Sequence, residues 1–479
     1  MSKFVKSSIW SLSASVSMRL LSLISYPFLV KYYLKSDIAI FKSFQAITLI
    51  LITIIPLGTD ILYISTNKEK RENYWELFFW ASFLIAFIIS IIFMFNESFS
   101  SFLLKSEINY QKRILFAIFP LIEFLKVIYI IKFTSLMNFK EISTAIFVNK
   151  FILNFIIISS AFFFPTIEIL ILAVIISEIL EMIILLIYSR RSKLKLFPKF
   201  NMNNLKIDSK SRKFIFFSGG DKLINSFAIQ FPIIFLVIIL GEELAPEFQL
   251  PLYAVSVPAS LIMISFSKVL FPYFSNIQDN LKIKETLLSI EFIITLIVLP
   301  ILICISFFSS EIVSLLFDRS WGNAILALKI LPIAIFANVI NNPFTHLAPI
   351  KRKPQINFLY SISLLTIKLL AIYLGYRFYG FIGVVIFYCF GEVLVRFLRL
   401  FIFDCKLIDL SGFELILHIK NNLIFSSVLG FSMFTLFALY NNKILSIAIS
   451  ISIFILLNFT FQKKKLFFLF HKIRDAIMA

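Results

Sequence analysis

Residues 167–188 read IEILILAVIISEILEMIILLIY, and residues 189–213 read SRRSKLKLFPKFNMNNLKIDSKSRK. The first stretch is apolar over a length that matches the hydrocarbon core of a bilayer, which about 20 helical residues cross. The second stretch is rich in lysine and arginine, as loops on the cytoplasmic side of a membrane are. Together they predict a membrane-spanning helix that is followed by a cytoplasmic segment.

Apolar runs of similar length recur on both sides of this break, and hydrophobic residues make up 59% of the chain. Ordinary soluble domains are about 45–50% apolar, so lipid must cover much of this surface. The predicted spanning helices are residues 9–33, 39–64, 74–95, 114–137, 143–164, 167–188, 214–240, 252–274, 287–308, 324–348, 355–374, 381–403, 423–440 and 444–461. We therefore expect an all-α polytopic membrane protein of about fourteen transmembrane helices.

The basic break also predicts the domain organisation. We expect an N-terminal six-helix lobe at residues 1–188, a cytoplasmic linker at 189–213 and a C-terminal six-helix lobe at 214–405, with a cavity between the lobes. Residues 406–479 would add two further helices and a basic tail. Basic loops on one side and the acidic segment GEELAPEFQLP (241–251) on the other indicate a bacterial inner-membrane protein with both termini in the cytoplasm.

Composition and motifs exclude several classes of function. The net charge of +19 is located in short loops and not on a soluble basic face, which argues against nucleic acid as a partner. The three cysteines, Cys304, Cys389 and Cys405, are too far apart in sequence for a metal site. No HExxH, GxSxG or phosphate-binding glycine loop occurs, so we expect neither an enzyme nor a cofactor.

Charged residues inside the predicted helices are the candidate functional residues, because placing a charge in hydrocarbon costs about 2.5–3.5 kcal/mol on insertion scales. Arg19 is the clearest, since Ser8, Ser11, Ser15 and Ser22 share its helical stripe. That stripe either faces a cavity or packs against another helix, with Arg19 paired to an acid such as Glu178 on a different helix.

Further cations and acids lie in other predicted helices. Lys222 follows Asp221 in the seventh helix, and the other buried cations are Lys126, Lys150 and Lys368. Two acids precede a cation by three or four residues, Glu123 before Lys126 and Glu392 before Arg396, which predicts ion pairs within one helix.

Other polar side chains in the membrane leave more than one interpretation open. Glu178, Glu181 and Asp60 lack such a neighbour on their own helix and require a partner from another helix or a bound cation. Asn342, near Asn338 and Asn341, could contact sugar hydroxyls or join two helices.

The chain resembles the O-antigen and polysaccharide flippases of the Wzx type, in the superfamily that also contains multidrug exporters and the lipid II flippase. The resemblance extends over residues 1–405 and rests on five stretches: YPFLVKYYL (26–34), PLGTD (56–60), SGGDKLIN (218–225), VPASLIMISFSKVLFPYFSNI (257–277) and KRKPQ (351–355). It implies alternating access between two lobes, with an undecaprenyl-pyrophosphate-linked oligosaccharide as substrate and membrane lipid and a polysaccharide polymerase complex as candidate partners.

The resemblance and the chemistry of pyrophosphate together suggest roles for these residues. A guanidinium matches phosphate with a planar fork of donors, so Arg19 is the first candidate for binding the pyrophosphate and Lys222 the second. Lys126, Lys150, Lys368 and Asn342 are further candidates for substrate binding.

Transport coupled to an inward cation gradient needs a membrane carboxylate. Asp221 is the first candidate for this coupling carboxylate, and Glu178 and Asp60 are the alternatives. The competing functions are drug efflux by another exporter of the superfamily and polymerisation of polysaccharide by a membrane enzyme.

Overall fold

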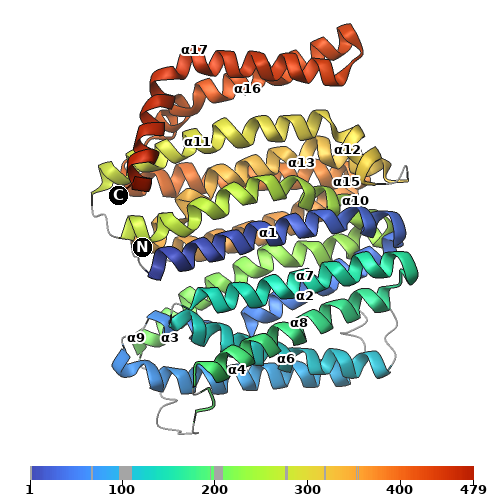
Figure 1. Ribbon diagram of the computed structural model, residues 1–479, viewed down its shortest axis with the longest axis vertical. Helices are drawn as coiled ribbons and strands as arrows, with labels where there is room; N and C mark the ends of the chain where they lie inside the picture. The colour runs from blue at the N-terminus through green and yellow to red at the C-terminus, as the bar shows by residue number, and fades with distance from the viewer. Residues whose placement is uncertain are drawn as a thin grey trace. The chain divides into compact units, whose positions relative to one another are not determined.

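The computed structural model describes residues 3–65, 68–96, 110–136, 138–194, 196–198, 209–275, 279–317, 320–351, 353 and 355–478, and Figure 1 shows its course. Every regular element in these residues is a helix. The chain forms two compact units: unit 1 contains residues 1–250, 316–318 and 353–391, and unit 2 contains residues 251–315, 319–352 and 392–479.

The first ten helical elements are as follows: α1 (Lys3–Tyr32), α2 (Lys35–Ile54), α3 (Thr59–Ser65), α4 (Lys68–Phe95), α6 (Tyr110–Ser135), α7 (Phe139–Phe163), α8 (Ile167–Arg191), α9 (Ser209–Phe214), the π-helical turn η2 (Ile215–Gly219) and α10 (Gly220–Ser275). In unit 1, α1 packs along α7, α7 along α8, and α4 along α6 (Figure 1). The side chains of Ser8, Ser11 and Ser218, and linker residues 199–208, lie outside the described residues.

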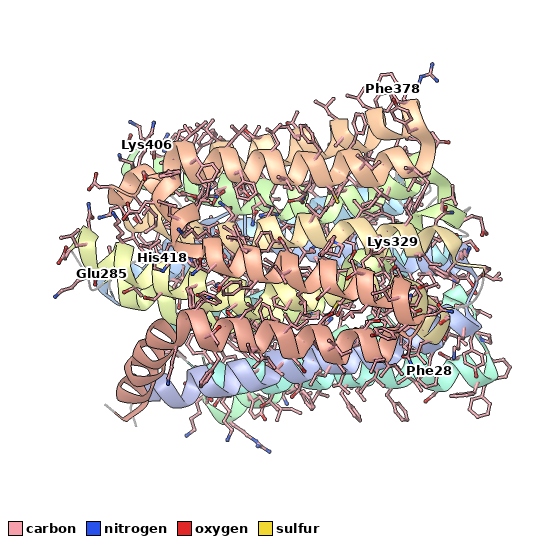
Figure 2. All side chains as sticks on the ribbon, turned by 90° about the horizontal axis from the view of Figure 1, so that it is seen from above. Phe28, Glu285, Lys329, Phe378, Lys406 and His418 are labelled. Carbon is pink, nitrogen blue, oxygen red and sulfur yellow. The ribbon has the colours of Figure 1, made fainter. Side chains whose placement is uncertain are left out.

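The remaining elements are α11 (Asn280–Phe307), α12 (Ser309–Leu316), α13 (Gly322–Asn341), the 3-10 turn η3 (Pro343–His346), α14 (Leu347–Ile350), α15 (Gln355–Arg399), the π-helical turn η4 (Leu400–Asp404), the 3-10 turn η5 (Cys405–Ile408), α16 (Gly412–Tyr440) and α17 (Lys443–Met478). In unit 2, α11 packs against α13 and α16, and α16 packs against α17. Figure 2 shows the exposed side chains of Glu285 and Lys406 toward one end of these helices and that of Lys329 toward the other.

Two helices reverse direction at a glycine. The 56 residues of α10 would extend about 84 Å if straight, more than twice the thickness of the hydrocarbon core. Gly241 has φ 79° and Gly380 in α15 has φ 57°, values that glycine adopts at little cost because it lacks a Cβ atom. Each of these two long helices is therefore two helices joined without a loop.

The segment GEELAPEFQLP was predicted to be an outer loop, but residues 242–251 are helical. The helix after Gly241 begins before the predicted start at Leu252 because Glu247 does not need water to satisfy its charge. The Nζ atom of Lys35 lies 2.7 Å from Oε1 of Glu247, whose side chain is 3% exposed.

The described residues contain ten stretches that are long and apolar enough to cross a membrane. Two of them, 215–263 and 355–408, contain the reversals and are each long enough for two spans, and α1 and α6 have spanning length at 30 and 26 residues. The total is fourteen helices of spanning length, which confirms the predicted all-α polytopic membrane fold.

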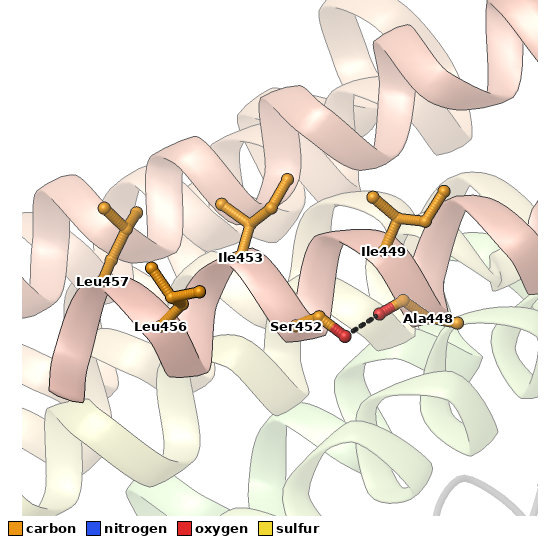
Figure 3. Close-up of a pocket in the computed structure, with 6 residues that line it drawn as sticks. All are labelled: Ala448, Ile449, Ser452, Ile453, Leu456 and Leu457. Carbon is orange, nitrogen blue, oxygen red and sulfur yellow. Dashed lines mark hydrogen bonds between the residues drawn. The ribbon is translucent and has the colours of Figure 1, made fainter. Parts of the chain in front are cut away.

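The outer surface of α17 is suited to lipid. Figure 3 shows its shallow apolar hollow, which includes Ile453 and Leu456, with exposed fractions of 37% and 64%. The one hydroxyl there belongs to Ser452, and it donates to the carbonyl oxygen of Ala448 at 2.8 Å. The polar group of this hollow is therefore already hydrogen-bonded within the helix, as contact with hydrocarbon requires.

Candidate functional site: buried charges within the two units

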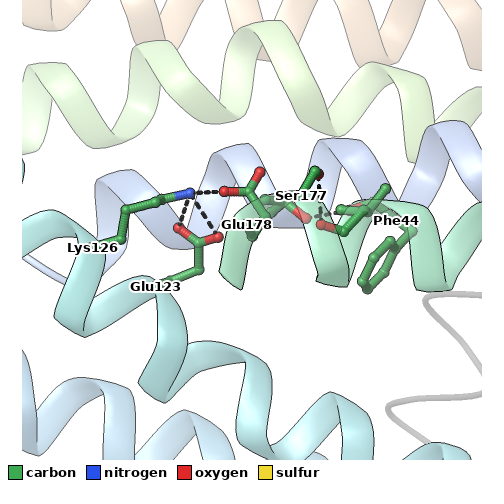
Figure 4. A network of polar contacts seen from close by, with 7 residues as sticks. Phe44, Glu123, Lys126, Ser177 and Glu178 are labelled. Carbon is green, nitrogen blue, oxygen red and sulfur yellow. Dashed lines mark hydrogen bonds and ion pairs between the residues drawn. The ribbon is translucent and has the colours of Figure 1, made fainter. Parts of the chain in front are cut away.

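A lysine and two glutamates form an ion-pair network inside unit 1 (Figure 4). The Nζ atom of Lys126 lies 2.9 Å from Oε1 and 2.8 Å from Oε2 of Glu123, and it also forms an ion pair with Glu178 of α8. The exposed fractions of the Lys126, Glu123 and Glu178 side chains are 3%, 0% and 7%. The predicted Glu123–Lys126 pair is confirmed, and of the two alternatives predicted for Glu178, a partner from another helix or a bound cation, the structure shows the first.

This network extends toward α7. Glu181 lies three residues after Glu178, so both carboxylates lie on one side of α8, and both are buried. Both acids interact electrostatically with Lys150 of α7. Three helices thus contribute charges of both signs to the interior of unit 1.

Arg19, Lys42 and Lys150, which we call the basic trio, belong to α1, α2 and α7. Ser25 donates to Oδ1 of Asn154 at 2.5 Å, and the Tyr33 hydroxyl lies 2.6 Å from Oγ of Ser160, so α1 and α7 run in the same direction. Arg19 lies six residues before Ser25, and Lys150 four residues before Asn154. These separations correspond to about 9 and 6 Å along the two axes, which puts Arg19 and Lys150 at nearly the same depth.

Lys42 belongs to the same region. Its Nζ atom donates to the Tyr26 hydroxyl of α1 at 2.9 Å and lies 4.8 Å from the centre of the Tyr26 ring. It also interacts electrostatically with Lys150. Lys42 and Lys150 are thus close enough to interact, Lys150 also faces the carboxylates of α8, and Arg19 lies at nearly the same depth as Lys150.

The PLGTD and SGGDKLIN stretches meet in unit 1, where an ion pair joins two residues that are 162 positions apart in sequence. Gly58 of PLGTD packs directly against Gly219, and a Cβ atom on Gly219 would lie 2.8 Å from the Cα atom of Gly58. Next to this contact, Lys222 donates to Oδ2 of Asp60. The Lys222 side chain is 36% exposed, whereas that of Asp60 is 3% exposed. A predicted substrate-binding cation and a predicted coupling carboxylate thus form a pair at the backbone contact of α3 with η2.

Asp221 and Lys368 belong to the contact between α10 and α15. Ser361 Oγ donates to Oδ1 of Asp221 at 2.9 Å, and Nζ of Lys368 donates to the carbonyl oxygen of Ala228 at 3.1 Å. Both hydrogen bonds join residues 140 apart, so the two helices run parallel in a constant register. Asp221 and Lys368 each bridge two helices.

Unit 2 contains the predicted Glu392–Arg396 pair, which is confirmed with Nε of Arg396 2.5 Å from Oε2 of Glu392. A second pair joins Nε of Arg399 to Oδ2 of Asp404 at 2.9 Å, and both side chains are almost completely buried. Asn342 is at the junction of α13 and η3, where its carbonyl oxygen accepts a hydrogen bond from Oγ1 of Thr345 at 2.6 Å.

An apolar groove of about 590 Å³ lies in unit 2, lined by α11, α12, α16 and α17. Its walls include Pro300, Phe308 and Phe454, and Glu311 lies on its rim. Partial burial raises the pKa of Glu311, but hydrogen bonds from Lys443 and Ser310 outweigh this effect and hold the pKa below its ordinary value. The groove is thus apolar along its length and ionic at one end.

One protein family matches more than half of this sequence. The model of the polysaccharide biosynthesis protein family matches residues 38–326, more than half of the 479 residues. The chain belongs to this family.

One related protein matches part of this sequence. The lipopolysaccharide biosynthesis protein WzxC of Escherichia coli (strain K12) is 25% identical over 184 residues, which are 38% of this chain and 37% of that protein. The chain therefore spans little more than a third of that relative's length in the match.

Two solved structures show the same fold. The lipid II flippase MurJ in an inward closed conformation has a TM-score of 0.71 at 15% identity, covering 96% of this chain and 100% of MurJ. An outward-facing multidrug resistance MATE family transporter of the MOP superfamily has a TM-score of 0.60 at 16% identity, covering 85% of this chain and 95% of the transporter.

In this polysaccharide biosynthesis protein, sequence reasoning missed Lys42, Glu291 and the Arg399–Asp404 pair. A signal was available for the first two, because each is a single charge in an otherwise apolar run, FKSF for Lys42 and SIEFI for Glu291. The Arg399–Asp404 pair joins residues five apart, which is outside the spacing at which side chains meet on a regular α-helix. The π-helical turn η4 changes that spacing and brings the two charges together.

Proposed function

We propose that this protein is a flippase that moves an undecaprenyl-pyrophosphate-linked oligosaccharide across the bacterial inner membrane by alternating access between lobes at residues 1–188 and 214–405. Both termini would be cytoplasmic, as the distribution of basic residues favours. Membership of the polysaccharide biosynthesis protein family supports this class of function. The likeness to WzxC and MurJ, a lipopolysaccharide biosynthesis protein and a lipid II flippase, points in the same direction.

The observation that carries the proposal is the basic trio. A pyrophosphate group has strong negative charge, and it crosses hydrocarbon readily only if cations replace the water that it loses. Arg19, Lys42 and Lys150 supply such cations from three helices of unit 1. Arg19 can also bind two phosphate oxygens at once through its planar fork of donors.

The other predicted substrate-binding residues differ in what they contact. Lys126 already lies between two carboxylates, and Lys222 is paired with Asp60 but has a side chain that is 36% exposed. We therefore rank Lys222 above Lys126 for contact with the pyrophosphate. Lys368 and Asn342 stay candidates for contact with the substrate.

The apolar groove of unit 2 supports a lipid-linked substrate. Its walls come from α11, α16 and α17, and its lining is almost entirely hydrocarbon. A polyprenyl chain needs an apolar path of this kind while its head group crosses. The two C-terminal helices, which the twelve helices of the predicted lobes do not include, would then help to hold the tail.

Cation coupling is the second part of the proposal. The Asp221 carboxylate accepts a hydrogen bond from Ser361, so a cation that bound there would act on α10 and α15 together. Asp60 and Glu178 are alternatives, and each would have to exchange a lysine partner for the cation.

Drug efflux is the competing function, because MATE transporters share the fold. A cationic drug would be repelled by basic side chains such as Arg19 and Lys150. The basic trio therefore favours an anionic substrate.

The test measures surface polysaccharide and membrane-protein abundance in a strain that lacks its own flippase. We expect Arg19→Ala to accumulate normally and to lose export, and Arg19→Lys to recover part of it, because an ammonium keeps the charge but loses the fork. Lys31→Ala is the matched control, since Lys31 is an exposed cation near the end of the same helix. Full export by Arg19→Ala would refute the assignment, and joint loss of protein and export would instead assign Arg19 to a structural ion pair.

A further inference from the structure

Glu291 lies near the middle of α11, and no part of its side chain reaches the surface. It is 0% exposed, and neither carboxylate oxygen has a hydrogen-bond partner among the residues that the structure describes. Eleven residues precede it in α11, and it is the fifth residue of the predicted span 287–308, so it lies about 6 Å inside that span.

An ionised carboxylate in this position would be very unstable. Moving an unpaired charge into a medium of low dielectric costs many times more than one hydrogen bond returns, and such groups become neutral instead. The neutral acid has one O–H donor and loses far less on burial. The geometry therefore requires a proton on Glu291 in this conformation.

The groups around Glu291 do not offer a ready countercharge. The thiol of Cys405 interacts electrostatically with both Glu291 and Asp404, and Arg399 already pairs with Asp404. The titratable and charged groups on the elements packed against α11 are Lys329 of α13, His346 of η3, Cys405 and Lys406 of η5, and Glu414, His418, Lys420 and Tyr440 of α16. Arg399 and Asp404 lie just before η5, and α11 itself also carries Lys282, Lys284, Glu285 and Cys304.

The turn that carries Glu291 is also where the C-terminal helices attach. Nδ2 of Asn422 in α16 donates to the carbonyl oxygen of Phe292 at 2.9 Å and to Oγ1 of Thr295 at 2.8 Å. Nε2 of Gln462 in α17 donates in turn to Oδ1 of Asn422 at 2.9 Å. A change of charge at Glu291 would thus occur one residue from the hydrogen bond that joins α16 to α11.

We propose that Glu291 is a proton-binding site of unit 2. Its carboxyl group holds a proton while α11 is packed against its neighbours, and it releases the proton when water reaches this turn of the helix. Proton loss leaves a carboxylate that the packed site cannot accommodate. The ligand is a single proton, bound to one carboxylate oxygen and released to water as a hydronium ion. If the chain is a flippase, a step that rests on the function proposed above, this proton is a candidate coupling ion.

The first test measures how thermal unfolding in detergent depends on pH for the wild type and for Glu291→Gln, a neutral side chain of the same shape. A glutamate in water has lost its proton above about pH 5, whereas the folded protein keeps it, so the folded state binds more protons. Stability of the wild type must then fall as pH rises. We expect its unfolding constant to increase, relative to that of Glu291→Gln, by up to tenfold per pH unit.

Glu285→Gln is the control, because Glu285 is exposed on the same helix and should leave the pH profile unchanged. Identical pH profiles for the wild type and Glu291→Gln would overturn the proposal. Failure of Glu291→Gln to fold would also overturn it, since a neutral side chain of this shape should be tolerated.

The second test separates the proton site from the proposed transport. In vesicles, Glu291→Gln should lose the dependence of transport on a pH gradient that the wild type shows. If the wild type moves no lipid-linked sugar, the flippase proposal fails while the unfolding measurement still decides whether Glu291 binds a proton. If Glu291→Gln keeps the full dependence on the gradient, coupling through Glu291 is excluded.

Discussion

Removal of the Lys126 charge should destabilise the protein strongly. Lys126→Met would leave Glu123 and Glu178 buried without their cation, at exposed fractions of 0% and 7%. Breaking a buried ion pair by removing one partner costs about 3–5 kcal/mol, because the remaining charge is stranded. At about 1.4 kcal/mol per factor of ten, the unfolding constant should rise by roughly a hundredfold to several thousandfold.

A triple variant tests whether the cost arises from the stranded carboxylates. Lys126→Met combined with Glu123→Gln and Glu178→Gln removes all three charges, and replacing a whole buried network with neutral groups is often close to neutral in stability. The triple variant should therefore recover most of the lost stability. Arg191→Met, which removes an exposed cation from the end of α8, should have little effect.

The assay compares abundance in membranes, thermal unfolding in detergent and surface polysaccharide for the same set of variants. We expect Lys126→Met to lose abundance and stability, and export to fall in proportion to abundance. A Lys126→Met protein that is as stable as the wild type and yet cannot export would refute this reasoning. That result would instead support the sequence-based prediction that Lys126 binds the substrate.

Two other predictions concern the glycine contact and the topology. Gly219→Ala should destabilise the protein by about 1–3 kcal/mol, as overpacking does, because its new methyl group would meet the backbone of Gly58. Gly220→Ala should destabilise the protein less, since its methyl group would meet the Phe358 ring, which can move. Equal melting temperatures for the two variants would contradict this prediction. Alkaline phosphatase fused after Arg191 should be inactive, and fused after Gly241 it should be active, because the first site is predicted to be cytoplasmic and the second periplasmic; activity at Arg191 would invert the proposed orientation.

The helices and the local ion pairs could be predicted from the sequence. Hydropathy locates membrane spans because their length is set by the bilayer, and the Glu123–Lys126 and Glu392–Arg396 pairs follow from helical spacing alone. The helical segment after Gly241 was missed because a cluster of acidic residues in the sequence is typical of a loop exposed to water. Lys35, more than two hundred residues away in sequence, neutralises Glu247 there.

The long-range pairs could not be predicted, because they depend on which helix faces touch. Asp60 and Lys222 were each recognised as unusual, but nothing in the spacing of either stretch indicated that Gly58 and Gly219 bring them together. Helices in lipid associate through small residues and shape, for which hydropathy carries little information.

The attachment of the C-terminal helices has a practical consequence. Asn422 and Gln462 link α11, α16 and α17 through amides that carry no net charge, so neither salt nor membrane voltage should weaken the link. The hairpin of α16 and α17 should then follow α11 as a rigid extension during any rearrangement. A spin label or fluorophore at Leu456, which is 64% exposed on the outer face of α17, would report the movement of α11 without a substitution in α11 itself.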